Sequence, residues 1–548
     1  MKLIANAAIP MRARSTFGTE LRPVRPGVRP IVWSIAGSDS GAGAGLQADL
    51  KALQAFGVHG CTAVASITAQ NSVAVTRVEP VSAELLDAQL DALAHDLPPQ
   101  AIKTGLLGSV DNVRVVCRWV DRLRARGLPV ALVVDPVLGS TTGASFASEA
   151  LVQAYVQELL PRATLVTPNR AEAEKLLTAL GLDASIAVPA AAAALARVGK
   201  SNVSVVITGG DAPACNGARW DRLAADWVHC PQASGWLSLP RVTTAHHHGT
   251  GCTFASTAAA ALASGYCVAD AVVLAKMATT HALRHAYAAG QGAGPVQAWP
   301  DFAQHIDNLP AFTLPGATTP LALHTQQPCA LLNNPALGVY AVVDSADWVR
   351  RVLAAGIRTV QLRIKDPTEP KLAAQIQDSI AIARATPGAQ LFINDHWQLA
   401  LQHGAYGVHL GQEDLETVDM DALRKAGVRL GLSTHSYWEV ARAWALRPSY
   451  IACGPIFATQ SKDMPWIPQG LDNLRYWAGV LPLPVVGIAG IDVHNVADVA
   501  ATGAASAAVI SAITQVADPV QACRALQQGF AGTGFFDSTR LLSQLTFT

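Results

Sequence analysis

The sequence predicts two α/β domains in tandem, the first with a mostly parallel sheet and the second with a barrel of βα units. The chain has 548 residues, which is enough for two large domains at roughly 100–200 residues each. Apolar strand-like runs alternate with Ala- and Leu-rich helical runs over residues 31–300, and the alternation resumes over 337–530. This rhythm is typical of parallel sheets covered by helices.

In the first domain, short apolar runs mark the strands of a sheet covered on both faces. The strand candidates are Ile31–Ala36, Gly60–Ser66, Ala101–Thr104, Ala131–Asp135, Thr164–Thr167 and Val203–Ile207. The most apolar stretch, Phe254 to Ala275, is interrupted by Gly265 and Asp270. We therefore expect a buried helix and its successor there, not a membrane span.

In the second domain, eight βα units follow one another within about 200 residues. The strand candidates are Gly338–Val343, Thr359–Arg363, Gln390–Ile393, Gly407–His409, Arg429–Ser433, Tyr450–Cys453, Val485–Ile488 and Ala507–Ile510. This repetition predicts a compact (β/α)₈ barrel, whose chemistry lies at the C-terminal ends of its strands.

Composition shifts predict the domain borders. The expected division is an extension over 1–29, a first domain over 30–305, a Pro-rich linker over 306–336, a second domain over 337–530 and a tail over 531–548. A short helix around Asp301–Asp307 can still belong to the first domain. The basic, Pro-containing residues 1–29 fit a disordered extension or a start misplaced upstream of Met11 better than an organelle transit peptide.

Charge and cysteine usage narrow the functional classes. Lys+Arg and Asp+Glu are both 40, which argues against nucleic acid or anionic membrane as the main partner. The nine cysteines form no CxxC pair, which fits a reducing cytosol and no structural zinc. We expect small-molecule substrates as partners of a cytoplasmic homo-oligomer.

Two segments of the first domain suggest phosphate chemistry. A strand runs into the glycine-rich turn at 37–45, which permits close approach to a ligand but is a weak signal alone. Gly249–Cys252 precedes an Ala-rich helix, where free N–H groups can cradle a phosphoryl group. There the helix field is expected to lower the pKa of the Cys252 thiol and make it a usable base. The alternative is an inert buried cysteine.

The neighbouring histidine run, His246 to His248, invites a metal interpretation that we reject. Consecutive side chains point apart, and the run adjoins a phosphate loop instead of a carboxylate cluster.

The second domain places charge at its strand ends. Gln361, Arg363 and Lys365 alternate along one strand and so share a face, which needs an anionic ligand to offset burial. Asp395 and Asp414 end two successive strands, so we expect them to be neighbours with Mg²⁺ between them. An Arg–Asp salt-bridge network is the alternative. Loops at 487–490 and 509–512 follow the last two strands, where barrels often bind phosphate.

The first domain resembles the hydroxymethylpyrimidine and phosphomethylpyrimidine kinases of thiamine biosynthesis, which have the ribokinase-like three-layer α/β/α fold. The matching segments are 36–40, 45–51, 68–72, 103–107, 135–137, 167–169 with 172–173, and 248–253. The resemblance implies a pyrimidine pocket lined by Gly37, Asp49, Gln70 and Leu106. It implies that Asn169, Glu172 and Asp135 serve Mg·ATP or its metal. It also implies that Gly249, Gly251 and Cys252 form the anion hole and place the base.

The first domain departs from that family at four places. Residues 41–45 read Gly-Ala-Gly-Ala-Gly where Gly-Gly-Ala-Gly is usual, and His247-His248 replaces Thr-His. Residues 138–142 lack a lysine that many relatives carry, and Asp211 replaces a common histidine. None removes a residue needed for phosphoryl transfer, although the last two could alter ATP contacts.

The second domain resembles thiamine phosphate synthase over about residues 337–525. The matching segments are 361–365, 394–395, 407–414, 432–435, 454–457, 459–462, 490–491 and 509–513. That family joins a pyrimidine methyl diphosphate to thiazole phosphate and releases pyrophosphate. The resemblance implies that the C–O bond breaks first, giving a carbocation that the thiazole nitrogen captures.

The same resemblance assigns roles in the barrel. Asp395 and Asp414 would hold Mg²⁺, and Arg363, Lys365 and Lys462 would stabilise the pyrophosphate, with Arg363 and Lys462 as the catalytic cations. Ser433 would contact the pyrimidine, and Gly490 and Ser511 the thiazole phosphate. The other expected binding residues are Gln361, Asn394, Thr459, Ser461, Val509 and Ile510. Ala489 stands where relatives usually have glycine, so phosphate affinity should fall if this position needs a positive φ.

Taken together, the motifs predict a bifunctional thiamine-biosynthesis enzyme that uses Mg²⁺ and ATP. One rival keeps the kinase fold but takes pyridoxal; the run at 68–71 disfavours it. Another makes one domain a non-catalytic sensor; the intact Cys252, Asn169/Glu172 and Asp395/Asp414 sets disfavour that.

Overall fold

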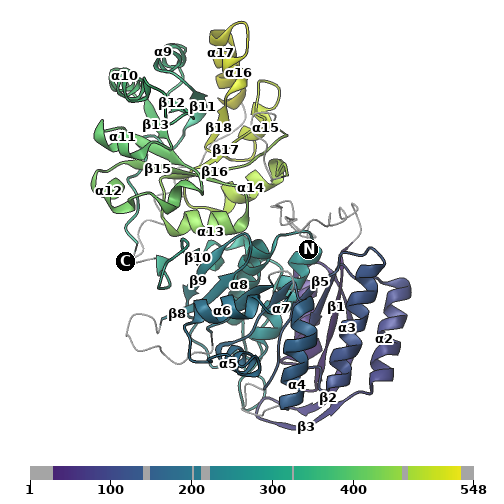
Figure 1. The fold of residues 1–548 in the computed structure, drawn as a ribbon. Coiled ribbons are helices and arrows are strands. Elements are labelled where there is room, and N and C mark those ends of the chain that lie inside the picture. The colour runs from purple at the N-terminus through teal and green to yellow at the C-terminus, as the bar shows by residue number, and fades with distance from the viewer. Residues whose placement is uncertain are drawn as a thin grey trace. The chain divides into compact units, whose positions relative to one another are not determined.

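The computed structural model describes residues 29–139, 148–199, 203–210, 222–323, 326–458 and 467–531. These residues divide into two compact units, the first reaching Leu323 and the second beginning beyond it. Figure 1 shows a sheet with helices in the first unit and a closed barrel ringed by helices in the second. We describe each unit by itself.

A 10-stranded sheet in the order β10-β9-β8-β7-β6-β5-β4-β1-β2-β3 forms the first unit. Its strands are β1 Ile31–Asp39, β2 His59–Gln70, β3 Val75–Pro80, β4 Ala101–Thr104, β5 Ala131–Val134, β6 Leu165–Val166, β7 Ser204–Ile207, β8 Leu223–His229, β9 Ser234–Pro240 and β10 Ala311–Phe312. The six predicted strands form its parallel centre, and antiparallel β3 and β8 to β10 flank them.

Helices cover both faces of this sheet, giving the three layers that the resemblance implied (Figure 1). The helices are α1 Gly45–Phe56, α2 Ala83–Asp96, α3 Val110–Ala125, α4 Glu149–Ala154, α5 Arg170–Ala179, α6 Val188–Ala196, α7 Thr250–Ala263 and α8 Val268–Arg284. The expected helix pair in the apolar stretch corresponds to α7 and α8, both largely buried. Within the described residues, no helix combines the length and apolarity needed to cross a bilayer.

The far edge of the first sheet is closed by a segment from beyond α8. Ala311 and Phe312 of β10 pair antiparallel with β9, and the Trp236 N–H donates to Thr313 Oγ1 at 2.9 Å. The Ser238 hydroxyl donates to the Leu321 carbonyl at 2.6 Å. The first unit therefore includes residues that the sequence had suggested for a linker beginning at 306.

The second unit is the closed barrel β11-β12-β13-β14-β15-β16-β17-β18, with every neighbouring pair parallel. The strands are β11 Gly338–Val343, β12 Thr359–Leu362, β13 Gln390–Asn394, β14 Gly407–Leu410, β15 Arg429–Thr434, β16 Tyr450–Cys453, β17 Val485–Gly487 and β18 Ser506–Val509. This confirms the predicted barrel.

Helices surround the barrel and leave its strand ends to loops (Figure 1). They are α9 Ala346–Ala354, α10 Leu372–Arg384, α11 Trp397–Gln402, α12 Met420–Lys425, α13 Tyr437–Ala445, α14 Gly470–Val480, α15 Val496–Ala500, α16 Ser511–Thr514 and α17 Pro519–Ala531. Inside the barrel, an aromatic cluster around Tyr340, Phe392 and Tyr450 fills the core. Barrels of this kind are packed with side chains and have no pore.

Candidate active sites

In the first unit, the glycine-rich turn is built around one carboxylate. Asp39 ends β1 and accepts hydrogen bonds from the N–H groups of Gly41 at 2.8 Å, Gly43 at 2.9 Å and Ala44 at 2.8 Å. Its Oδ2 also lies 3.2 Å from His248 Nε2. Burial favours a higher pKa for Asp39, but these hydrogen bonds outweigh it and lower the pKa. Asp39 therefore ties this turn to the residue that precedes the predicted anion loop.

The anion loop begins α7 and packs directly on the glycine-rich turn. Gly249 has φ +87°, and a Cβ there would overlap the Gly43 carbonyl oxygen, so only glycine fits. In the described part of the chain, no side chain caps this end of α7. The first N–H groups of a helix lack partners within it and favour anions. Gly251, whose Cβ position faces open space, leaves room for one.

A buried charge cluster lies beside this loop. Lys103 of β4 bonds to both carboxylate oxygens of Asp49, at 2.9 and 3.1 Å, and lies 3.6 Å from Asp135. Ser34 and Ser256 also donate to Asp49, at 2.6 and 2.8 Å. Burial raises the pKa of Asp135 to about 6, although Lys103 opposes the shift. The sequence had not singled out Lys103 as a site residue, although a lysine in a short parallel strand was a usable signal.

Cys252 lies among these groups, but the expected lowering of its pKa was wrong. Its thiol receives a hydrogen bond from the Gly45 backbone, and the side chain is only partly accessible. Desolvation raises the pKa to about 12, and the charge of Lys103 offsets only part of this. Burial thus outweighs the field at the helix end.

We expect the Cys252 thiol to react slowly with alkylating agents in the native protein. With a pKa near 12, its alkylation by iodoacetamide at pH 8 should be at least about 100-fold slower than that of an exposed cysteine. Peptide mass spectrometry after timed alkylation measures this rate. Denatured protein is the control, since the same peptide should then react at the ordinary rate. Equally fast alkylation of native Cys252 would contradict the raised pKa.

The predicted pyrimidine residues surround the end of β1. A Cβ on Gly37 would lie 3.2 Å from Leu106 Cδ2, so Gly37 and Leu106 face each other. Gln70 Nε2 lies 3.3 Å from His248 Nε2. The strand order reverses at β1, because β2 and β3 lie on one side of it and β4 and β5 on the other. Such switch points are where open α/β sheets bind ligands. Asp49 is fully buried with its oxygens engaged by Lys103 and the two serines.

Asn169 and Glu172, predicted to serve Mg·ATP, form a capping box at the start of α5. Asn169 Oδ1 accepts from the Glu172 N–H, and Glu172 Oε2 accepts from the Asn169 N–H, both at 2.9 Å. Asn169 also bridges to Thr208 beyond β7. This geometry fixes both side chains at the C-terminal edge of the sheet, and their nucleotide role stays a prediction.

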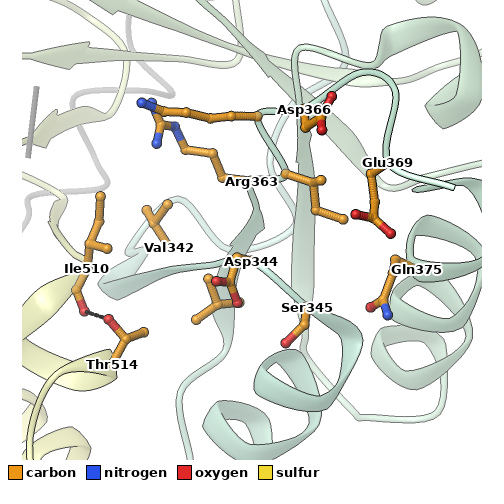
Figure 2. Close-up of a pocket in the computed structure, with 12 residues that line it drawn as sticks. Val342, Asp344, Ser345, Arg363, Asp366, Glu369, Gln375, Ile510 and Thr514 are labelled. Atoms are coloured by element: carbon orange, nitrogen blue, oxygen red, sulfur yellow. Dashed lines mark hydrogen bonds between the residues drawn. The ribbon is translucent and has the colours of Figure 1, made fainter. Parts of the chain in front are cut away.

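In the second unit, a cavity of about 510 Å³ opens at the ends of β11, β12 and β18. Figure 2 shows Arg363 on its wall, with Asp344 and Ser345 after β11 and Ile510 and Thr514 at α16. Lys365 also lines it. Burial lowers the pKa of the Arg363 guanidinium, and Asp395 opposes this shift. Gln361 is buried inside the barrel. β12 ends at Leu362, so the prediction that Arg363 and Lys365 alternate with it along one strand was wrong, and both cations lie beyond the strand end.

Asp395 and Asp414 come together at the ends of β13 and β14. Burial, followed by the charge and hydrogen bonding of Asp414, raises the pKa of Asp395 to about 6, and Arg363 opposes this. Asp414 Oδ2 accepts from the Gly411 N–H at 2.7 Å. Asp395 has φ +60°, an uncommon conformation for a residue with a side chain. Asn394, which precedes it, is buried.

Ser433 ends the row of inward-facing residues on β15 and is held from two sides. His409 Nε2 lies 2.8 Å from Ser433 Oγ, and Gln412 Nε2 donates to the Ser433 carbonyl at 2.9 Å. Burial, with the charge of Arg363, lowers the pKa of His409 to about 3. His409 was quoted in a matching segment but was not predicted as a site residue. A histidine in a buried strand was the signal.

The predicted phosphate loops follow β17 and β18. Ala489 and Gly490 have φ +73° and +71°, and Asn495 Nδ2 donates to the Gly490 carbonyl at 2.9 Å. Val509 is buried at the end of β18, Ser511 begins α16, and the hydroxyl of Thr514 donates to the Ile510 carbonyl (Figure 2). Thr459, Ser461 and Lys462 lie outside the described residues, as do Ser140 to Thr142 and Asp211.

Replacing Ala489 by glycine should stabilise the barrel. Alanine at φ +73° is strained by about 1 kcal/mol relative to glycine, so the midpoint of thermal unfolding should rise. A contribution of this position to the predicted phosphate site would show as a lower KM for thiazole phosphate. Ala374→Gly in α10 is the matched control and should destabilise by about 1 kcal/mol. An unchanged KM for thiazole phosphate would separate position 489 from phosphate binding.

A histidine-rich cluster joins α8 to residues 301–308 but does not suit a metal. His281 Nε2 and His305 Nε2 face the two oxygens of Asp301, at 3.0 and 3.2 Å. The Asn308 amide is oriented by Arg284 and the Phe302 carbonyl, so its Nδ2 donates to His281 Nδ1. His281 therefore keeps its proton on Nε2, the atom that a metal would need.

Each unit matches a different family model. Residues 39–297 match the family model for phosphomethylpyrimidine kinase, and residues 339–513 match that for thiamine monophosphate synthase. A thiamine-phosphate synthase of Serratia proteamaculans is 55% identical over 183 residues, covering 33% of this chain and 86% of that protein. A pyridoxal kinase structure from Staphylococcus aureus covers 50% of this chain and 94% of its own, with 31% identity and a TM-score of 0.43.

One relative spans both units. A probable thiamine biosynthetic bifunctional enzyme of Oryza sativa, described as chloroplastic, is 32% identical over 498 residues, covering 88% of this chain and 86% of that protein. The chain belongs to the bifunctional thiamine biosynthesis enzymes, with a phosphomethylpyrimidine kinase domain followed by a thiamine-phosphate synthase domain.

Proposed function

We propose that the kinase domain transfers phosphoryl groups from Mg·ATP, first to the hydroxyl of hydroxymethylpyrimidine and then to the resulting monophosphate. The observation that carries this is the open end of α7 beside the Lys103–Asp49–Asp135 cluster. A helix end and a buried cation supply the positive field that phosphoryl transfer requires. Gly251 leaves space for the migrating group, and Gly249 lets the loop pack against the glycine-rich turn.

In this proposal, Gly37, Gln70 and Leu106 form the pyrimidine pocket, with Asp49 beneath it. The Gln70 amide can both donate and accept, as an aminopyrimidine edge requires. Because its pKa is raised to about 12, the Cys252 thiol keeps its own proton and is not available to accept that of the substrate, so its place in this proposal is in the wall of the anion loop. Asn169 and Glu172 hold the nucleotide side of the site, and Asp135 faces metal or nucleotide.

We propose that the barrel condenses the pyrimidine methyl diphosphate with thiazole phosphate, giving thiamine phosphate and pyrophosphate. Asp395 and Asp414 fit a divalent cation because they are adjacent carboxylates. The raised pKa of Asp395 indicates that too little positive charge surrounds its ionised form. A bound Mg²⁺ would neutralise charge on the diphosphate. Arg363, Lys365 and Lys462 stabilise the departing pyrophosphate, while Gln361, Asn394 and Ser433 surround the pyrimidine.

The thiazole phosphate is assigned to the loops after β17 and β18. Gly490, Val509, Ile510 and Ser511 offer backbone N–H groups there, as barrels commonly do for phosphate. Thr459 and Ser461, which follow β16 in the sequence, would add hydroxyls. We further propose that the enzyme acts as a cytoplasmic homo-oligomer whose partners are its small-molecule substrates.

A single reaction tests both halves. Purified protein is mixed with Mg·ATP, hydroxymethylpyrimidine and thiazole phosphate, and thiamine phosphate is read by mass spectrometry. Product supports both sites and their order. Accumulated pyrimidine diphosphate without product would refute the barrel assignment, and absence of even the monophosphate would refute the kinase assignment. Pyridoxal supplied in place of the pyrimidine tests the rival kinase substrate.

A further inference from the structure

Five polar side chains from five strands form one hydrogen-bonded chain through the barrel interior. Gln361 Nε2 donates to Tyr340 Oη at 3.3 Å, and Tyr340 Oη lies 2.8 Å from Tyr450 Oη. Tyr450 Oη lies 2.7 Å from His409 Nδ1, and His409 Nε2 lies 2.8 Å from Ser433 Oγ. The chain therefore runs from one predicted binding residue, Gln361, to another, Ser433.

Packing fixes the members of this chain in place. Tyr340, Tyr450 and His409 are all buried, and Phe392 packs edge-on against the Tyr450 ring at 5.1 Å. The His409 and Tyr450 rings stack at 5.7 Å. A Cβ on Gly431 would overlap the Tyr450 ring and hydroxyl, so glycine at this position lets the phenol cross the barrel. Side chains held this tightly cannot readily exchange partners.

The direction of the hydrogen bonds follows from the orientation of the Gln361 amide, whose Nε2 faces Tyr340. The Gln361 amide donates to Tyr340, so the Tyr340 hydroxyl is free to donate to Tyr450. The Tyr450 hydroxyl then donates to His409 Nδ1. A buried imidazole between two hydroxyls is neutral and carries one N–H. That N–H is on Nε2 and donates to Ser433 Oγ.

We propose that this hydrogen-bonded series of side chains makes Ser433 a hydrogen-bond donor to the substrate. Tyr340, Tyr450 and His409 are positioning residues that set the direction of the Ser433 hydroxyl. Among the described residues, His409 is the hydrogen-bond partner of the Ser433 hydroxyl. Because Ser433 accepts from His409, its own proton points elsewhere. An aminopyrimidine offers ring nitrogens as acceptors and its amino group as a donor. Ser433 thus recognises a ring nitrogen, an assignment that rests on the function proposed for the barrel.

The histidine tautomer can be measured without any substrate. Full-length protein labelled with ¹⁵N-histidine is examined by long-range ¹H–¹⁵N correlation, and the His409 signals are assigned by their loss in His409→Gln. We expect the proton on Nε2, and a mixture of tautomers in Tyr450→Phe. A proton on Nδ1 in the unsubstituted protein would mean that every hydrogen bond in the series runs in the opposite direction. That result would overturn the proposal, whatever the enzyme catalyses.

Substrate discrimination provides the second measurement. The synthase rate is compared for the pyrimidine diphosphate and for pyridine analogues in which one ring nitrogen at a time is replaced by C–H. Tyr450→Phe should lower kcat/KM for the pyrimidine about tenfold, the effect of one hydrogen bond. It should also reduce the preference over one analogue by a similar factor. Equal losses on all substrates would mean a structural role only and would overturn the proposal.

Tyr406→Phe is the matched control. The Tyr406 ring packs on the same Phe392, but its hydroxyl donates to Gln390, which is not part of the hydrogen-bonded series. This variant should keep the native preference between the substrates. If the unsubstituted enzyme acts on neither the pyrimidine nor its analogues, the proposed barrel function fails, while the tautomer measurement still decides the direction of the chain.

Discussion

Replacing Lys103 by methionine is expected to abolish pyrimidine phosphorylation while thiamine phosphate synthesis from supplied diphosphate continues. Lys103 is the buried cation that holds Asp49 and faces Asp135, beside the loop that we assign to the migrating phosphoryl group. Its loss removes positive field from the transition state, an effect of about 10²–10³-fold on rate. It also leaves the Asp49 charge buried, at a cost of about 3–5 kcal/mol in the free energy of unfolding of the kinase domain.

A second variant separates catalysis from folding. In Lys103→Met/Asp49→Asn, the buried charge is removed with its partner, so the stability of the kinase domain should largely return. This identifies the buried Asp49 charge as the cause of the lost stability, while the folded Lys103→Met protein reports on catalysis. Thermal unfolding and the two half-reactions are measured on each variant, with synthase activity as the internal standard. Substantial phosphorylation by a folded Lys103→Met protein would refute the role of this cation.

Asp395→Asn is expected to abolish thiamine phosphate synthesis, leave pyrimidine phosphorylation unchanged and stabilise the metal-free barrel. Loss of one carboxylate from the Asp395–Asp414 pair should lower the synthase rate at least about 100-fold. Asparagine suits the position because it tolerates the φ of +60° found there. Removing a half-buried charge beside Asp414 should raise the free energy of unfolding by about 1 kcal/mol after allowance for solvent screening.

The stabilisation of the barrel by Asp395→Asn should depend on pH. The folded-state pKa of Asp395 is raised to about 6 from an ordinary 3.8, so its ionised form destabilises the fold above pH 6. The increase in the free energy of unfolding caused by Asp395→Asn should therefore be complete above pH 6 and vanish as the pH falls towards 3.8. Thermal unfolding in EDTA across this range measures it. Asp421→Asn, at an exposed carboxylate on α12, should change neither stability nor activity.

The barrel could be predicted almost completely because every strand is a short apolar run between helical segments. The first sheet was predicted only at its parallel centre. β8 and β9 contain polar and small residues such as Asp226 and Ser238, whose side chains are satisfied by Lys276 and Leu321. These partners are distant in sequence, so no local pattern reveals such strands. Two-residue β10 has no periodicity at all.

Site residues could be predicted where a motif follows the end of a strand. They were missed where burial determines the pKa and the hydrogen-bond partners of a side chain. Asp395 and Asp414 follow from strand order alone. The Cys252 pKa depends on desolvation by burial in the folded protein, which outweighs the local helix end. Lys103 and His409 act through partners brought together only by the folded sheet and barrel. Residue type showed where polar groups are buried, but not which partners they meet.

The short strand β10 determines where the kinase could be separated from the synthase. A kinase fragment that ends at residue 305 would lack Ala311–Phe312. Strand β9, whose residues are mostly buried in the full chain, would then be an edge strand with unpaired backbone groups. Such edges recruit strands from other molecules, so this fragment should self-associate and precipitate. A fragment that continues to Leu323 keeps its own protective border, together with the Ser238–Leu321 contact. Residues 311–323 therefore protect the sheet edge of the kinase domain against self-association, whether or not the synthase follows.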